Sequence, residues 1–247
     1  MLEKPYSSRQ TNETQFSEVR SIGYNVGVMF LWTLVEFLAL RVDMHRNPIS
    51  AVLLFVAVEF LFTGLFIVTH DSIHGNVSRA FPTLNRNMGV VAISCFAWFD
   101  YDMLKSKHRL HHVHTGKIEH DPDFHRGDSS FGAWFGGFML SYLTISQLAK
   151  IGIYILILHL AFKLSLLNII AYVGAAPIVS AVRLFYFGTF LPHRPSVHGG
   201  ETTGHGSRSS GSSVFVSFFK CYHFDYHWEH HRWPRVPWFD LPFVRRV

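Results

Sequence analysis

Cysteine is nearly absent from this chain of 247 residues, which contains only Cys95 and Cys221. Two cysteines cannot build a disulfide framework, and they cannot supply the four thiolates of a structural zinc site. Nothing in the cysteine content therefore points to an oxidising compartment. A metal site in this protein has to draw on other ligands.

Charged side chains are also scarce, since Asp, Glu, Lys and Arg together make up 16% of the residues. A soluble domain carries about a quarter, whereas 49% of this chain is hydrophobic and it contains 24 Phe and 6 Trp. The net charge of +5 comes from basic residues in loops beside apolar segments. That placement favours a membrane surface over nucleic acid, so we expect a lipid bilayer as a partner and no nucleic acid.

Four apolar segments are long enough, or nearly so, to cross a bilayer core of roughly 30 Å as helices. They cover residues 22–42, 49–69, 148–163 and 166–190. The short links after the first and third segments predict two helical hairpins. We expect one all-α, integral membrane domain over 1–247, with four transmembrane helices, a polar segment at 1–21 and a histidine-rich helical cap.

Further apolar and polar segments lie between and after the hairpins. Met88–Phe99 is too short to cross a bilayer, so it predicts an interfacial or buried helix. Residues 131–147 contain three glycines and are expected to lie partly in the membrane interface. Residues 199–213 are rich in Gly, Ser and Thr, which is typical of a mobile loop.

Lysine and arginine are distributed unequally along the chain. Three of them lie in 1–21, seven in 71–130 and seven in 191–247, whereas the two proposed outer turns carry Arg46 and Lys163. Cytoplasmic loops hold the excess of basic residues in membrane proteins. We therefore expect both termini and every histidine cluster on the cytoplasmic side.

Histidine is abundant, with 17 residues, and three clusters have the spacing of metal ligands on a helix. His70 and His74 stand at i and i+4. Two triplets at i, i+3 and i+4 follow later in the chain: His108, His111 and His112, and then His227, His230 and His231. Such positions share one helix face, so neutral imidazoles can converge there on a metal.

His193 directly follows the last apolar segment and is a ninth candidate ligand. Nine imidazoles exceed the needs of one ion and suit two ions, and imidazole binds Zn, Cu, Fe and Ni. The Glu-x-x-His motif of soluble di-iron bundles and the His-Glu-x-x-His motif of zinc hydrolases do not occur. The predicted ligand set is therefore all nitrogen, although one such cluster alone also fits a solvated polar loop.

Residues beside the histidines suggest supporting roles. Four acidic side chains can accept N–H bonds from ligating imidazoles, with surface charge as the alternative: Asp71, Asp121, Asp225 and Glu229. Five aromatic side chains can line an opening for an apolar substrate, with interfacial anchoring as the alternative: Phe96, Trp98, Phe99, Phe131 and Trp134.

Two charges fall inside the predicted spans. Glu59 lies 11 residues before His70, and Arg183 lies 10 residues before His193. At a rise of 1.5 Å per residue, both lie roughly 15 Å from the histidine layer. Because charges inside a bilayer usually pair, we expect an ion pair that ties the second span to the last. A protonated Glu59, or a pair with Glu36 instead, is the alternative.

The histidine pattern resembles that of the membrane fatty-acid desaturase and hydroxylase superfamily. Three motifs narrow the resemblance to bacterial-type beta-carotene ketolases: His70–Gly75, Phe187–Arg194 and Tyr226–Pro234. The similarity runs from about residue 22 to the C-terminus. It implies two non-haem Fe(II) ions, O2 as co-substrate, and electrons from reduced ferredoxin or a similar donor.

The same resemblance implies a reaction. A ketolase of this kind oxidises carbon 4 of a beta-ionone ring twice, and the geminal diol loses water, so that beta-carotene becomes echinenone and then canthaxanthin. A carotenoid hydroxylase or a lipid desaturase is the nearest alternative, because the ligands do not fix where the substrate lies. A histidine-rich metal transporter is less consistent with the sequence, since transporters hold ligands near the bilayer midplane.

Overall fold

The computed structural model describes residues 16–194 and 206–245. Within these ranges the regular secondary structure is entirely helical, which confirms the all-α prediction. Residues 199–205 of the predicted mobile loop lie outside the described residues, as do residues 1–15 of the polar N-terminal segment and the final residues 246–247.

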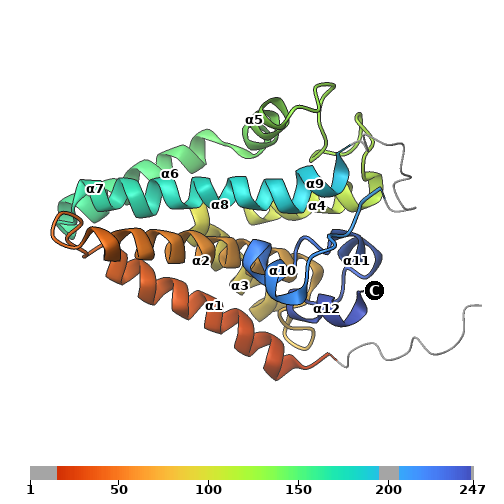
Figure 1. The fold of residues 1–247 in the computed structure, drawn as a ribbon, viewed down its shortest axis with the longest axis horizontal. Coiled ribbons are helices and arrows are strands. Elements are labelled where there is room, and N and C mark those ends of the chain that lie inside the picture. The colour runs from red at the N-terminus through yellow and green to blue at the C-terminus, as the bar shows by residue number, and fades with distance from the viewer. Residues whose placement is uncertain (1–15, 195–205, 246–247) are drawn as a thin grey trace, which may run out of the picture.

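The first hairpin consists of α1 (Glu18–Ala39) and α2 (Pro48–His74), which pack against each other (Figure 1). The Ser17 side chain caps α1, and Pro48 begins α2 with a φ angle already suited to a helix. At the other end of α2, Gly75 has a φ of 74°, a left-handed conformation that glycine adopts without strain. The helix therefore ends directly after its two histidines.

Helix α2 lies at the centre of the bundle, against α1, α3 (Pro82–Ala97) and α8 (Ala176–Phe185). Its buried side chains include Val58 and Leu65. At Gly89 of α3 even a Cβ atom would collide with the Ser72 side chain, so glycine is what allows the two helices to approach there. The close packing fixes the end of α2 that carries the histidines.

The last span is one irregular helix from Leu166 to His193. It runs through α7 (Leu166–Asn168), η3 (Ile169–Ala175), α8, η4 (Tyr186–Phe190) and α9 (Leu191–His193). The segments η3 and η4 are π-helical turns, and each ends two residues before a proline, Pro177 or Pro192. Because proline removes a backbone N–H and crowds the preceding turn, a widened turn accommodates it within a continuous helix.

Three helices are long and apolar enough to cross a membrane, judged by length and composition: Glu18–Ala39, Pro48–Ile73 and Leu166–His193. They correspond to the first, second and fourth predicted spans. A fourth crossing depends on a bent pair of helices, so the described residues support three or four spans.

The bent pair consists of α5 (Phe131–Tyr142) and α6 (Ile145–Leu156), which is continued by the π-helical η2 (Ile157–Ala161). The two arms meet at 84°, and the Thr144 side chain caps the start of α6. The third span is predicted at 148–163. In the structure its helix begins at Ile145, and α5 precedes that helix only across the sharp bend.

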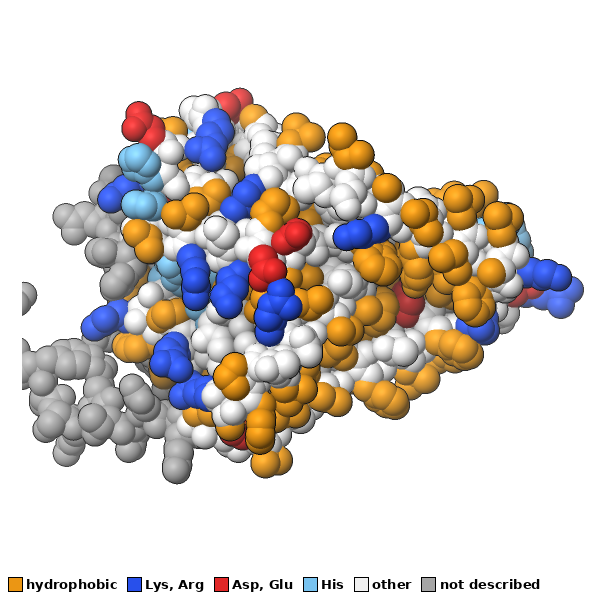
Figure 2. All heavy atoms as spheres, turned by 180° about the vertical axis from the view of Figure 1, so that it is seen from behind, with side chains coloured by type: hydrophobic (Ala, Val, Ile, Leu, Met, Phe, Trp, Pro, Cys, Tyr) orange, Lys and Arg blue, Asp and Glu red, His pale blue; other side chains and the backbone are white. Residues whose placement is uncertain are grey.

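Both hairpin turns lie at one end of the molecule, and the histidine-bearing helices lie at the other (Figure 1). That broad end contains α4 (Tyr101–His114), α9 and the C-terminal elements, which are α10 (Val214–Cys221), α11 (His227–Arg232), η5 (Trp238–Asp240) and α12 (Leu241–Val244). Figure 2 shows hydrophobic side chains over the narrow part and Lys and Arg gathered over the broad part, with a few more Lys and Arg at the tip of the narrow part. This distribution is typical of a bundle whose narrow part is embedded in a bilayer; the side of the membrane stays a prediction.

Candidate metal centre

The nine predicted ligands meet at the broad end, although they come from four separate segments of the chain. The last turn of α2 supplies two, one face of α4 supplies three, the end of α9 supplies one and α11 supplies three. Most are buried, and they form two clusters.

The first cluster contains His70, His74, His108 and His230, whose ligand atoms lie within 4.8 Å of one another. The Nε2 atoms of His70 and His230 are 3.1 Å apart, and those of His74 and His108 are 2.8 Å apart. His112 joins this cluster, because its Nε2 lies 3.0 Å from Nε2 of both His108 and His230. Five imidazole nitrogens therefore converge on one point.

The second cluster contains His111, His193, His227 and His231, again with ligand atoms within 4.8 Å of one another. The Nε2 atom of His231 lies 3.2 Å from that of His111 and 2.9 Å from that of His227. The His193 ring centre lies 4.8 Å from the ring centres of both His111 and His227. His193, which has no other histidine at helical spacing, thus lies with the other members of the cluster.

The free lone pairs of these rings fit metal ions. His193 Nδ1 donates to the Gly206 carbonyl at 2.9 Å, and its buried Nε2 has no hydrogen-bond partner among the described residues. Leaving such an acceptor buried and unpaired is costly. Ligand nitrogens about 2.1 Å from one ion lie about 3 Å apart when adjacent, which is the spacing found in both clusters.

The protonation state of the histidines in the clusters also suits metal binding. Burial, reinforced by neighbouring imidazoles, lowers the pKa of His108, His227 and His230 well below the usual value. The same causes lower the pKa of His112 to about 2. These rings are therefore neutral at ordinary pH, and the neutral ring is the form that binds a metal.

Asp121 orients one ligand of the second cluster. Both of its carboxylate oxygens lie close to His111 Nδ1, at 2.9 and 3.0 Å, so the Nδ1–H bond leaves His111 Nε2 free to face the cluster. Burial alone would lower the pKa of His111, but the bond to Asp121 outweighs it and raises that pKa.

The other three predicted carboxylates have different neighbours in the described part of the chain. Asp71 accepts the Trp238 amide at 3.2 Å, and its nearer oxygen lies 3.9 Å from His70 Nδ1, beyond hydrogen-bond range. Asp225 accepts the Ser217 hydroxyl. Glu229 is buried on α11, and its Oε2 has no hydrogen-bond partner among the described residues.

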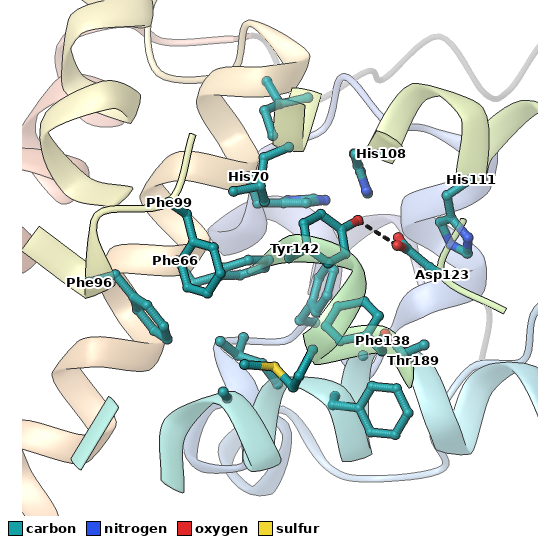
Figure 3. Close-up of a pocket in the computed structure, with 18 of the residues that line it drawn as sticks. Phe66, His70, Phe96, Phe99, His108, His111, Asp123, Phe138, Tyr142 and Thr189 are labelled. Carbon is teal, nitrogen blue, oxygen red and sulfur yellow. Dashed lines mark hydrogen bonds between the residues drawn. The ribbon is translucent and has the colours of Figure 1, made fainter. Parts of the chain in front are cut away.

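An apolar pocket with about 820 Å³ of empty space, part of it open to the surroundings, ends on both clusters (Figure 3). His70 and His108 of the first cluster and His111 and His227 of the second lie in its wall. Phe96 and Phe99 line it as well, together with side chains that the sequence did not single out, including Phe66, Phe138, Leu184, Phe185 and Phe224.

Three of the predicted aromatic residues do not line the pocket. Trp134 donates from Nε1 to the Asp123 carbonyl at 2.8 Å and packs edge-on against Phe185. Phe131 also packs against Phe185, with ring centres 5.6 Å apart. Trp98 packs edge-on against Tyr154. The first two rings contact a residue of the pocket wall instead of forming the wall.

Glu59 and Arg183 lie together between α2 and α8. Arg183 Nε donates to Glu59 Oε1 at 2.6 Å, and Nη2 donates to Oε2 at 2.5 Å. Arg183 Nη1 also donates to the carbonyls of Phe219 and Lys220 on α10. Glu36 forms no ion pair within the described ranges.

Comparison with known proteins agrees with this architecture. The sequence pattern that describes the fatty acid desaturase family matches residues 47–165 and 141–247. The chain belongs to this family. The matched residues include all nine histidines of the two clusters.

Several relatives of this desaturase-family chain carry ketolase names. It is 50% identical over 194 residues to zeaxanthin 4-ketolase of Chlamydomonas reinhardtii, which covers 78% of the chain and 44% of that protein. It is 45% identical over 199 residues to beta-carotene ketolase of Haematococcus lacustris, covering 78% and 61%. It is 33% identical over 232 residues to beta-carotene ketolase of Paracoccus sp. strain PC1, covering 92% and 93%.

The chain thus spans about half the length of the first two relatives, 44% and 61%, and nearly all of the Paracoccus protein. No solved structure matches the chain.

Proposed function

We propose that this chain is a membrane carotenoid ketolase with a centre of two Fe(II) ions and O2 as co-substrate. The observation that carries the proposal is the apolar pocket whose wall contains histidines of both clusters. Ketolase-named relatives at 33–50% identity support the assignment of the substrate.

The residues that would hold the ions are the nine histidines, five in the first cluster and four in the second. When bound, the irons supply the activation of O2 that breaking an unactivated C–H bond requires, which no side chain can provide. The chain itself orients the ring carbon, holds the ligands in the neutral form and keeps water from the reacting atoms.

The overall chemistry balances in two equal oxidations and one dehydration. Each oxidation of carbon 4 consumes one O2, two electrons and two protons, and releases one water while a C–H bond becomes C–OH. The second oxidation gives a geminal diol, which loses water to leave the ketone. The electrons come from reduced ferredoxin or a similar donor on the cytoplasmic side, where the basic broad end lies in this proposal.

The apolar lining matches a carotenoid better than a metal ion in transit. A long polyene partitions into the bilayer, and the pocket is lined both by apolar side chains of the spanning helices α2 and α8 and by histidines of both clusters. The clusters lie at one end of the spans, whereas transporters bind near the bilayer midplane. A carotenoid hydroxylase or a lipid desaturase remains the second candidate, because it would use the same ligands.

Pigment analysis of beta-carotene-producing cells that express the chain tests the proposal. We expect echinenone and canthaxanthin, formed only with O2, and two irons per purified chain. Hydroxylated carotenoids without ketone would assign the hydroxylase instead. One metal or none, with no oxidised carotenoid, would overturn the proposal.

Ligand variants refine the same test. His108→Ala should abolish turnover and reduce the iron content, and His193→Ala should remove about one metal per chain, because each occupies a different cluster. His45→Ala and His159→Ala are matched controls, since these residues lie in or near the hairpin turns, at the other end of the molecule. Normal iron content in His108→Ala would show that the ligand assignment is wrong.

A further inference from the structure

One hydrogen-bonded pair interrupts the apolar wall of the pocket. Tyr142 OH donates to Asp123 Oδ1 at 2.5 Å, and both side chains are buried. Figure 3 shows the pair between Phe138 and the histidines His108 and His111. Apart from the ligand histidines and Thr189, the rest of the lining is apolar. A wall that served only an unsubstituted hydrocarbon would not need this pair.

The pair does not serve the metal clusters in the way that Asp121 does. Asp121 takes the His111 N–H, whereas no described hydrogen bond joins Asp123 to a ligand histidine. Asp123 Oδ2 forms no hydrogen bond within the described ranges, since the Tyr142 hydroxyl bonds the other oxygen, Oδ1. Asp123 and Tyr142 both line the pocket, so the pair lies beside whatever the pocket holds.

A purely structural role is already filled by other contacts. The Trp134 indole bonds the Asp123 carbonyl and so ties α5 to the loop that carries Asp123. The Tyr142 ring packs against Phe138, with ring centres 4.9 Å apart, and lies 4.2 Å from Lys107 Nζ. These contacts hold the ring and the loop without the phenolic hydroxyl.

We propose that Asp123 and Tyr142 bind a hydroxyl group on the substrate ring, at or next to the carbon that is oxidised. The inference rests on the proposed function, in which the first oxidation leaves a hydroxyl on carbon 4 that must remain bound for the second. A hydroxyl already present on carbon 3 offers the same chemistry. Asp123 accepts from the hydroxyl through Oδ2, which no described hydrogen bond occupies.

This arrangement explains how an apolar pocket can retain a product that is more polar than the substrate. Without a partner, burying the new hydroxyl would weaken binding and favour release after one oxidation. With the pair in place, the singly oxidised ring is held for the second step. The pair thus determines whether the enzyme ends at an alcohol or at a ketone.

Carotenoid binding under anaerobic conditions tests the pair without turnover. The full chain in lipid nanodiscs is titrated with beta-carotene, with a 4-hydroxylated carotenoid and with a 3-hydroxylated carotenoid, and tryptophan fluorescence is followed. We expect the wild-type chain to bind a hydroxylated carotenoid about ten-fold more tightly than the Tyr142→Phe variant does. The two proteins should bind beta-carotene with the same affinity. If the 4-hydroxylated carotenoid binds more tightly, the pair binds the intermediate of the reaction itself. If the 3-hydroxylated carotenoid binds more tightly, the pair binds a substrate that already carries a hydroxyl.

Tyr142→Phe keeps the ring contacts and removes only the hydroxyl, so it is the primary variant, with Asp123→Asn as the second. Tyr172→Phe is the matched control, since it removes a buried hydroxyl that bonds the Ala51 carbonyl elsewhere in the bundle. In producing cells, Tyr142→Phe should raise the ratio of alcohol to ketone several-fold, and Tyr172→Phe should not.

Unchanged affinities and an unchanged alcohol-to-ketone ratio in Tyr142→Phe would overturn the inference while leaving the ketolase proposal intact. Conversely, wild-type protein that binds hydroxylated rings through the pair but makes no ketone would support the inference and remove the ketolase proposal.

Discussion

Asp121 is surrounded by donors: the His111 ring and the backbone amides of Gly116 and Asp123 all bond its carboxylate at 2.9–3.0 Å. Burial alone would raise the pKa of this carboxyl, but those bonds outweigh it and lower the pKa. The charged form is therefore favoured, and a charged acceptor fixes the His111 tautomer. One acidic residue couples the loop after α4 to the second cluster.

Asp121→Asn should weaken metal binding at the second cluster by roughly 10–100-fold, because an amide cannot accept from all three donors at once. Competition with a chelator, read as metals retained per chain, measures the effect. Asp102→Asn is the matched control, since Asp102 forms an exposed pair with Arg86. Equal metal retention in the two variants would contradict the role assigned to Asp121.

Single residues also show where sequence reasoning stops. The triplet on α4 shares one broad helix face, yet consecutive positions differ by about 100°, and His111 and His112 join different clusters. Which distant histidines each one meets depends on how four segments pack, and spacing along the chain carries no such information. Phe138 and Phe185 could not be singled out for the same reason. In their apolar segments, a residue that packs inside the bundle, one that contacts lipid and one that lines the pocket look alike in the sequence.

At the scale of helices, the ion pair between Glu59 and Arg183 joins α2 to α8, and the carbonyl contacts of Arg183 extend the link to α10. The side chain of Glu59 is 3% exposed and that of Arg183 26%. The pair could be predicted because Glu59 and Arg183 precede a histidine by nearly the same number of residues, 11 and 10, which places both charges at a similar depth. The ion pair therefore fixes the position of α2 relative to the last span, which ends at His193.

A double-mutant cycle on thermal stability tests this link. Glu59→Gln and Arg183→Gln should each destabilise the chain by about 1–3 kcal/mol, and the double variant should lose less than the sum by about 0.5–3 kcal/mol. The exposed pair Arg86 and Asp102 supplies a control cycle, where a coupling below about 1 kcal/mol is expected. Strict additivity at Glu59 and Arg183 would rule out the coupling.

The helical segments themselves were predictable to different degrees. Long apolar runs located the first, second and last spans, because length and hydropathy suffice for these. The break between α5 and α6 depends on how Leu143 and Thr144 leave the helix, and no glycine or proline marks it in the sequence between residues 138 and 151. The π-helical turns before Pro177 and Pro192 likewise shift the helix face in a way that a regular 3.6-residue period does not reveal.

Over the whole molecule, buried neutral histidines make stability depend on pH. In an unfolded chain imidazole titrates near pH 6.5, whereas burial lowers the pKa of five ligands outside the spans in the folded protein: His108, His112, His227, His230 and His231. Below about pH 6.5 the unfolded chain therefore binds more protons, and acidification favours unfolding.

We expect the apparent melting temperature of the metal-free chain in detergent to be steady above about pH 7 and to fall progressively as the pH is lowered through about 6.5. Metal loading should raise the melting temperature at neutral pH and be lost on acidification, because protons compete for the same nitrogens. A melting temperature that stays constant or rises between about pH 7 and pH 5 would contradict the assignment of these rings as buried and neutral.

The distribution of ligands along the chain has a consequence for biosynthesis. The first cluster needs His230, and three of the four members of the second cluster lie at or after residue 193 of a chain of 247. Neither set of histidines is complete until α11 has been synthesised, after α1, α2, α4 and the last span. In the proposed function, metal insertion has to wait for α11, because a chain that ends before residue 227 lacks one of five histidines in the first cluster and two of four in the second.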